Sequence, residues 1–322
     1  MSVLGGFVLA MIASFAQGAS LEPVATIPLP DVKGRIDHFA VDVKGRRLFV
    51  AALGNDTVEV LDIAHNRHER SLKGFGEPQG LLYLPETQLL YVANGSSNRL
   101  DILDARTFAP ARRMDKLDDA DNVRYDASAG SVIVGYGTGA LRIVDAATGA
   151  AKGDIRLDGH PESFQVERGG GRLFVNVPTQ RQVAVVDRAK GAVVATWRVS
   201  ARQNFPMALD EKGRRLFSGA RFPAVLLVHD LDTGKEVARL EIGEDTDDLF
   251  IDAERKRVYV ICGEGRVDVF RRESPDRYLR EGSVKTAPKA RTGLFVPEEG
   301  KLYVAAPASG GTAARILVYA VH

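Results

Sequence analysis

Short apolar runs separated by polar turns fill most of the chain. Val58–Asp62 alternates apolar and polar positions, which is the pattern of a half-buried β-strand. Leu48–Leu53 is apolar almost throughout, as in a strand that is covered on both faces. Gly54–Asp56 lies between them and supplies residues that tolerate a positive φ. With a first strand at His38–Asp42 and a more polar fourth strand at Glu69–Lys73, this pattern predicts a unit of four antiparallel strands.

This four-strand unit recurs seven times. A large apolar residue in the second strand recurs every 41 to 44 residues, at Phe49, Tyr91, Ile133, Phe174, Phe217, Tyr259 and Tyr303. An aspartate that ends the third strand recurs every 41 to 43 residues, at Asp62, Asp104, Asp145, Asp187 and Asp230. Phe270 and Tyr319 stand near its place in the last two units. Four antiparallel strands in about 42 residues make one propeller blade, so we predict an all-β, seven-bladed β-propeller.

The last unit is incomplete and predicts how the ring closes. Gly293–Val321 ends at its third strand, Arg315–Tyr319, and no fourth strand follows. Val24–Leu29 precedes the first unit and has the composition of a strand without a partner. We therefore predict that this N-terminal strand supplies the outer strand of the last blade.

The best copies of the unit carry a recognisable motif. They are Leu90–Gly95 with Leu100–Asp104, and Leu48–Ala52 with Val58–Asp62. These copies resemble the YVTN-type seven-bladed propeller repeats of bacterial exported proteins. The resemblance covers nearly the whole chain after the N-terminal segment and implies the fold. It implies little about function, because propellers serve both as binding proteins and as enzymes.

The N-terminus differs from the repeats. Val3–Phe15 is an apolar run with small residues, followed by the small-residue segment Ala16–Ser20. This predicts a signal peptide over residues 1–20, cleaved near Gly18, and a single propeller domain over residues 21–322. No Lys or Arg precedes the apolar run, and a buried strand or an uncleaved anchor is the alternative interpretation. We expect a periplasmic or secreted protein with no stable membrane insertion once the signal is removed.

Composition narrows the function classes. The net charge is +1 and no basic run alternates with aromatic residues, so we expect no nucleic-acid partner. The single cysteine, Cys262, lies in a strand pattern and is expected to be buried rather than reactive. His65 and His68 fall in a polar turn and are expected to be solvated. The chain has no Cys-x-x-Cys-His motif for covalent haem and no Gly-x-Ser-x-Gly nucleophile motif.

In a propeller, the residues at the start of each first strand converge on one mouth of the central channel. The inner positions of this mouth ring are His38, Gly80, Asn122, Ser163, Pro206, Asp248 and Thr292. The positions before them are Asp37, Gln79, Asp121, Glu162, Phe205, Asp247 and Arg291. Arg35, His160, Asn204 and Asp245 lie nearby in the sequence.

Four carboxylates in one ring repel one another unless a cation or Arg291 compensates, which indicates a ligand site. Hard oxygen ligands at Asn122, Glu162, Asn204 and Asp248 would suit Ca²⁺. Such a site is similar to those of the propeller lactonases and gluconolactonase-type esterases, which are six-bladed. His38 and His160, with Glu162 or Asp248, would suit Zn²⁺. The alternative is that these side chains cap turns and hold channel water.

A third chemistry would use Arg291, His160 and Glu162 to bind and hydrolyse an anionic lactone. This set of residues resembles the site of the seven-bladed phosphogluconolactonase-like propellers in residue types alone. Some related propellers carry quinone or haem cofactors, which leaves a redox-associated protein as a further interpretation.

We therefore expect a monomeric, non-enzymatic binding propeller that holds a small molecule, a metal ion or a protein at the channel mouth. The alternative is a metal-dependent lactonase or other hydrolase that uses the same mouth. The predicted ligand-binding residues are His38, Asn122, His160, Glu162, Asn204, Asp247, Asp248 and Arg291. The predicted metal ligands are His38, His160, Glu162 and Asp248. We predict no cofactor other than a divalent metal, Ca²⁺ or Zn²⁺, and no catalytic residue is assigned.

Overall fold

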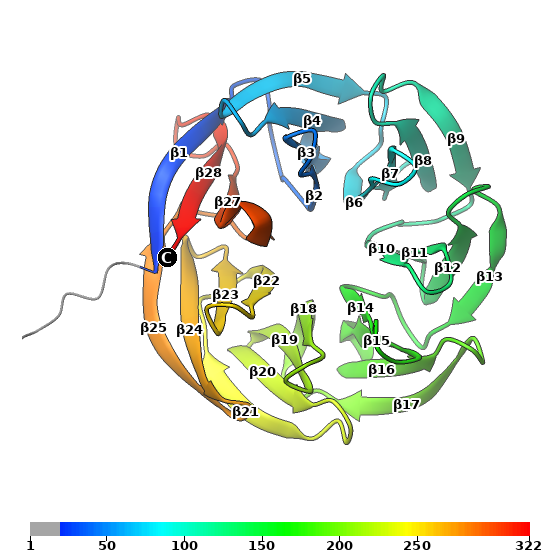
Figure 1. Cartoon of the computed structure of the whole chain (residues 1–322), viewed down its shortest axis with the longest axis vertical. Helices are drawn as coiled ribbons and strands as arrows, with labels where there is room; N and C mark the ends of the chain where they lie inside the picture. Colours follow the sequence, from blue (N-terminus) through cyan, green and yellow to red (C-terminus); the bar gives the residue numbers. More distant parts are fainter. Residues whose placement is uncertain (1–19) are drawn as a thin grey trace, which may run out of the picture.

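The computed structural model describes residues 20–322, which form a ring of seven four-stranded antiparallel blades (Figure 1). The predicted signal peptide lies outside the described residues, apart from Ser20. Among residues 20–322, no helix is both long and apolar enough to cross a bilayer. The helices that interrupt the strands are three short 3₁₀ turns: η1 (Leu53–Asn55), η2 (Pro178–Gln180) and η3 (Pro297–Glu299).

In blades 1 to 6, the strands run outward from the channel in chain order. Blades 1 and 2 are β2 (Phe39–Asp42), β3 (Arg47–Ala52), β4 (Thr57–Asp62), β5 (Arg67–Lys73), and β6 (Pro78–Leu84), β7 (Leu89–Asn94), β8 (Arg99–Asp104), β9 (Pro110–Asp115). Blades 3 and 4 are β10 (Val123–Asp126), β11 (Ser131–Tyr136), β12 (Ala140–Asp145), β13 (Ala151–Arg156), and β14 (Phe164–Val166), β15 (Arg172–Val177), β16 (Gln182–Asp187), β17 (Ala192–Arg198). Blades 5 and 6 are β18 (Arg202–Asp210), β19 (Arg215–Phe222), β20 (Ala224–Asp230), β21 (Glu236–Glu241), and β22 (Thr246–Asp252), β23 (Arg257–Cys262), β24 (Arg266–Ser274), β25 (Arg277–Lys285).

The last blade joins the two ends of the chain, as predicted. It consists of β26 (Gly293–Val296), β27 (Lys301–Ala306), β28 (Ala314–Val321) and, outermost, β1 (Leu21–Leu29). β1 pairs antiparallel with β28 from Leu21 opposite Val321 to Leu29 opposite Ala314. In Figure 1, the blue β1 follows the red β28 along the outside of the ring. The strand is three residues longer than the predicted Val24–Leu29.

Both repeat markers have a structural reason. The second-strand aromatic residues, such as Phe49 and Tyr303, are fully buried. The third-strand aspartates close the turn to the outer strand, because Asp104 Oδ1 accepts 2.9 Å hydrogen bonds from the backbone N–H groups of Arg106 and Thr107. In blade 6, β24 runs on to Ser274, so Phe270 is buried in mid-strand where a turn-capping aspartate is not needed.

The hydrophobic core is divided among the seven interfaces between neighbouring blades. Each of seven buried clusters joins two adjacent blades. Ile27 and Leu29 of β1 belong to the cluster between blades 7 and 1 and are fully buried. The N-terminal strand therefore closes the ring by apolar packing as well as by backbone hydrogen bonds.

Two expectations about individual side chains have different outcomes. Cys262 is fully buried, and burial raises the pKa of its thiol to about 12, as expected for an unreactive residue. His65 is exposed, but His68 is not simply solvated. His68 Nε2 lies 2.7 Å from the carboxylate of Glu59, which is completely buried in β4. The turn pattern gave no indication of this acid beneath His68.

Candidate functional site

The same backbone hydrogen bond holds three acidic residues at equivalent positions of the mouth ring. The N–H of Asp37, Asp121 and Glu162 donates to the second strand of its own blade, at 2.7, 2.9 and 3.0 Å. The following residue returns the bond through its carbonyl oxygen in each case. The repeated register therefore places acids from blades 1, 3 and 4 at equivalent positions of the mouth ring.

Blade 2 contributes space rather than a side chain. A Cβ on Gly80 would lie 2.1 Å from the backbone oxygen of Asp121. No side chain fits at that distance, and a backbone oxygen cannot swing aside as a flexible side chain could. Glycine at this ring position therefore lets Asp121 and Asn122, which lead into β10 of blade 3, approach closely.

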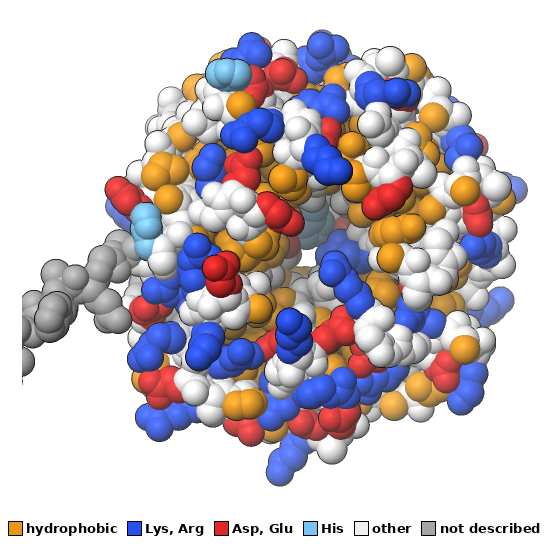
Figure 2. Space-filling view, in the orientation of Figure 1, with side chains coloured by type: hydrophobic (Ala, Val, Ile, Leu, Met, Phe, Trp, Pro, Cys, Tyr) orange, Lys and Arg blue, Asp and Glu red, His pale blue; other side chains and the backbone are white. Residues whose placement is uncertain are grey.

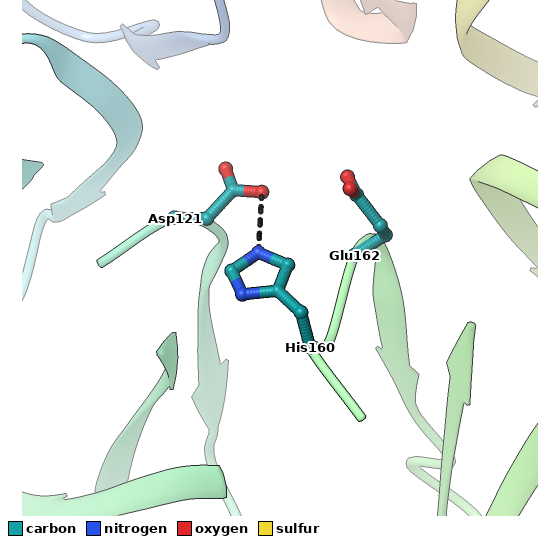
Figure 3. A group of neighbouring side chains, drawn as sticks. All are labelled: Asp121, His160 and Glu162. Carbon is teal, nitrogen blue, oxygen red and sulfur yellow. Dashed lines mark ion pairs between the residues drawn. The ribbon is translucent and has the colours of Figure 1, made fainter. Parts of the chain in front are cut away.

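Asp121, His160 and Glu162 form the group of described residues best arranged to hold a metal (Figure 3). One potential ligand atom from each lies within 4.8 Å of the others. His160 Nδ1 donates a 2.6 Å hydrogen bond to the carbonyl oxygen of Gly137, which can only accept. This bond leaves Nε2 directed at Asp121, 3.9 Å from its Oδ2. Metal-binding histidines are commonly oriented by such a second hydrogen bond.

The surroundings of this group shift the pKa values of Glu162 and His160. Burial, reinforced by the negative charges of Asp121 and Asp247, raises the pKa of Glu162 to about 8. Burial acts against protonation of His160, but Asp121 outweighs it and raises the pKa of His160 to about 9. Among residues 20–322, the Glu162 carboxylate has no hydrogen bond and no ion pair. Glu162 is therefore the member of the group whose carboxyl has no direct partner.

A second cluster pairs acids with arginines on the other side of the mouth. Arg291 lies 2.9 Å from Asp245 and 3.0 Å from Asp247. Arg221 lies 2.9 Å from Asp247, and Arg35 lies 2.7 Å from Asp37. Arg291 therefore compensates acidic charge at the mouth, and it shares this role with Arg35 and Arg221.

Sequence reasoning missed Arg221 and Arg124. Arg221 stands four residues after the second-strand marker, where the other units have Leu53, Gly95, Gly137, Pro178, Gly263 and Pro307. Arg124 occupies a first-strand position where the other units have Ala40, Leu82, Gln165, Ala208, Phe250 and Leu294. Each is the only charged residue at its repeat position. Scanning every repeat position for such exceptions would have found both.

His38 lies among the acids that line the channel. Its ring nitrogens lie 3.6 Å from Asp37 and 3.4 Å from Asp248. Burial opposes protonation, but the carboxylates of Asp248 and Asp37 prevail and raise the pKa of His38 to about 10. Asp248 also accepts a 2.9 Å hydrogen bond from the N–H of Gly293. His38 and Asp248 therefore link blades 1, 6 and 7 and are not members of the Asp121–His160–Glu162 group.

Of the two predicted asparagine ligands, Asn204 lies apart from that group and Asn122 lies beside Asp121. The Asn204 amide donates to Asn176 and to the Gln182 carbonyl, which ties blade 5 to blade 4. Asn122 is buried, and its amide lies 3.4 Å from Asp121. The predicted sets for Ca²⁺ and Zn²⁺ are thus only partly brought together: His160 and Glu162 meet, and Asp121 joins them in place of His38 or Asp248.

The space-filling view shows a ring perforated at its centre, with acidic and basic side chains around the opening and histidine atoms inside it (Figure 2). A pocket of about 360 Å³ adjoins His160 and Glu162. It extends to Thr179, Arg181, Arg202 and Phe205 of blades 4 and 5. The mouth therefore combines a candidate metal centre with a pocket large enough for a small molecule.

Comparison with known proteins identifies the fold and no more. No protein-family model matches the chain, and no curated protein matches its sequence. A chain from the crystal structure of a mitotic checkpoint complex is similar in structure, with a TM-score of 0.80 at 13% identity over 100% of this chain and 99% of that one. Kuenenia stuttgartiensis hydrazine synthase is similar with a TM-score of 0.71 at 16% identity, over 90% and 95% of the two chains. These likenesses support a seven-bladed propeller, while the YVTN resemblance stays a prediction.

Proposed function

We propose that this protein is a binding propeller that holds a divalent transition metal, Zn²⁺ in the first place, at its channel mouth. The ligands would be Asp121, His160 and Glu162. The observation that carries the proposal is that their ligand atoms lie within 4.8 Å of one another. The hydrogen bond from His160 Nδ1 to the Gly137 carbonyl oxygen orients the ring. A bound cation would also give the Glu162 carboxyl group a direct partner.

The donor set favours zinc over calcium. One imidazole nitrogen and two carboxylates suit Zn²⁺, whereas Ca²⁺ takes six to eight oxygen ligands. Ligand atoms around tetrahedral zinc stand about 3.3 Å apart, so small side-chain rotations would complete three positions. The fourth position would face the pocket beside His160 and Glu162, where a ligand could reach it.

Metal content and zinc titration test the proposal. Elemental analysis of the purified protein and calorimetric titration with Zn²⁺ should give one ion per chain. His160→Gln and Glu162→Gln should each weaken zinc binding at least about 100-fold. His65→Gln, which changes an exposed histidine, should leave it unchanged. Equal zinc affinity in the wild type and both site variants would refute the assignment.

A metal-dependent hydrolase is the second candidate function. The pocket beside His160 and Glu162 favours it, because hydrolysis needs substrate next to a metal-bound water. Turnover of a panel of lactones and esters by the zinc-loaded protein, lost in Glu162→Gln, would support it. If the protein hydrolyses no lactone or ester of the panel faster than buffer does, the hydrolase function is rejected and only the binding function remains.

Export to the periplasm or medium belongs to the same proposal and rests on the apolar run Val3–Phe15. Expression of the full chain in a bacterial host, with N-terminal sequencing of the recovered protein, tests it. Recovery outside the cytoplasm of a chain that begins near residue 19 is the expected result. An intact N-terminus on cytoplasmic protein would contradict it.

A further inference from the structure

The pocket beside the candidate metal centre has an unusual charge distribution. It lies between η2 of blade 4 and the start of β18 in blade 5, and has a volume of about 360 Å³. Its lining includes His160, Glu162, Arg181 and Arg202. The pocket is thus bordered by an acid, the histidine of the candidate metal centre and two arginines.

The two pocket arginines differ from the others at the mouth. Arg35, Arg221 and Arg291 are each paired with aspartates at 2.7 to 3.0 Å. Within residues 20–322, the side chains of Arg181 and Arg202 form no ion pair and no hydrogen bond. Both are exposed and border the pocket. Their donors are therefore available to a ligand, and a guanidinium fork fits the two oxygens of a carboxylate or phosphate.

An aromatic surface completes the pocket. Phe205, from the mouth ring of blade 5, is partly buried and borders the pocket. The guanidinium of Arg221 lies 4.3 Å from its ring centroid and fixes the ring by a cation–π contact. A ring held in this way offers a planar apolar surface at little entropic cost, because its side chain is already ordered.

We propose that this pocket binds a small organic oxyanion with a planar or apolar body. Its carboxylate or phosphate would bind Arg181 and Arg202, and its body would pack against Phe205. One of its oxygens would complete the coordination of the metal at Asp121, His160 and Glu162. The ligand class rests on the proposed function, because one oxygen of the anion would bind the metal that Asp121, His160 and Glu162 hold. Metal and anion should therefore strengthen each other's binding by the same factor.

Calorimetric titrations of the full chain test the proposal with benzoate and phenyl phosphate as probes and benzamide as the neutral counterpart. Each titration is run on zinc-loaded and on zinc-free protein. Both anions should bind the zinc-loaded protein at least about tenfold more tightly than the zinc-free protein. Arg181→Gln and Arg202→Gln should each weaken anion binding about tenfold or more. Arg156→Gln, an exposed arginine on β13 outside the pocket, is the matched control and should change nothing.

The outcomes separate the two proposals. Normal zinc binding with no anion binding, or with anion binding that ignores both arginines, would overturn the oxyanion pocket and leave the metal site standing. Benzamide binding as tight as benzoate would also overturn it. If zinc does not bind, the metal site is refuted, and the titrations of the zinc-free protein test the oxyanion pocket by themselves. Anion binding that needs Arg181 and Arg202 then supports the pocket, and its absence overturns it.

Discussion

His38 Nδ1 lies 3.4 Å from the carboxylate of Asp248, although 210 residues separate the two in the chain. The contact spans blades 1 and 6, which are not neighbours in the ring because blade 7 lies between them. Asp37 approaches the other ring nitrogen at 3.6 Å. Protonated His38 therefore interacts electrostatically with Asp37 of its own blade and with Asp248 of blade 6. These contacts connect the two blades on either side of blade 7, which closes the ring.

This arrangement predicts a pH-dependent stability. The raised pKa of His38, about 10, means that its contribution is complete below pH 6.5 and is lost as pH rises through about 10. His38→Gln should therefore lower Tm by about 5 °C at pH 6 and by little at pH 10.5. Thermal unfolding of both proteins across this range measures the effect, with His322→Gln as an exposed control. A Tm difference that does not change with pH would contradict it.

The pair of buried Glu59 and partly buried His68 predicts a different pH window. Hydrogen bonds from His68, Ser71 and Thr57 outweigh burial and lower the pKa of Glu59, while Glu59 raises the pKa of His68. The contribution of Glu59 is lost as pH falls below its usual range, and that of His68 is lost as pH rises above 6.5. Glu59→Gln should therefore reduce stability most between about pH 4.5 and 6.5. Denaturant unfolding at pH 5.5 and 9 should show the larger loss at pH 5.5, and the reverse order would refute this account.

Closure by β1 predicts an asymmetric effect of two substitutions on one strand. Ile27 is fully buried between blades 7 and 1, so Ile27→Ala should lower the free energy of unfolding by about 2–5 kcal/mol. Val24 is half exposed, and Val24→Ala should change it by less than about 0.5 kcal/mol. Urea unfolding compares the two. Equal effects would mean that β1 adds no apolar packing to the closure.

The thiol of Cys262 should not react in the folded protein. Burial raises its pKa to about 12, so little thiolate exists near neutral pH. Ellman's reagent at pH 8 should modify the native protein far more slowly than the urea-unfolded protein. Modification at similar rates would show that β23 opens readily.

Gly80 predicts a link between backbone packing and the candidate metal centre. Gly80→Ala would bring a Cβ to 2.1 Å from the Asp121 backbone oxygen, so the first strand of blade 3 must shift. We expect zinc affinity to fall about tenfold or more. Gly171→Ala adds a Cβ with no atom within 4 Å and serves as the control. Unchanged zinc binding in Gly80→Ala would show that Asp121 does not depend on this close approach.

The propeller, its blade boundaries and its closure could be predicted from the sequence because they depend on local patterns. Alternation along a strand, turn residues such as Gly54, and a capping aspartate such as Asp104 each act within a few residues. Because the unit recurs seven times, an irregular turn or strand in one unit does not hide the pattern. Even the closing strand could be inferred, because a seventh unit without an outer strand leaves an edge that Ile27 and Leu29 can cover.

The mouth ring was also predictable as a set, since equivalent positions in a repeat share one register. The sequence by itself determined that Asp37, Asp121, Glu162 and Asp247 face one opening. Only the tertiary structure decided that His160 meets Asp121 and Glu162, while His38 meets Asp248 and Arg221 pairs with Asp247. The reason is physical, because the pairing of two side chains depends on distances across the channel and between blades. These distances are set by the length and the rotamer of each side chain, and position in the repeat does not determine them.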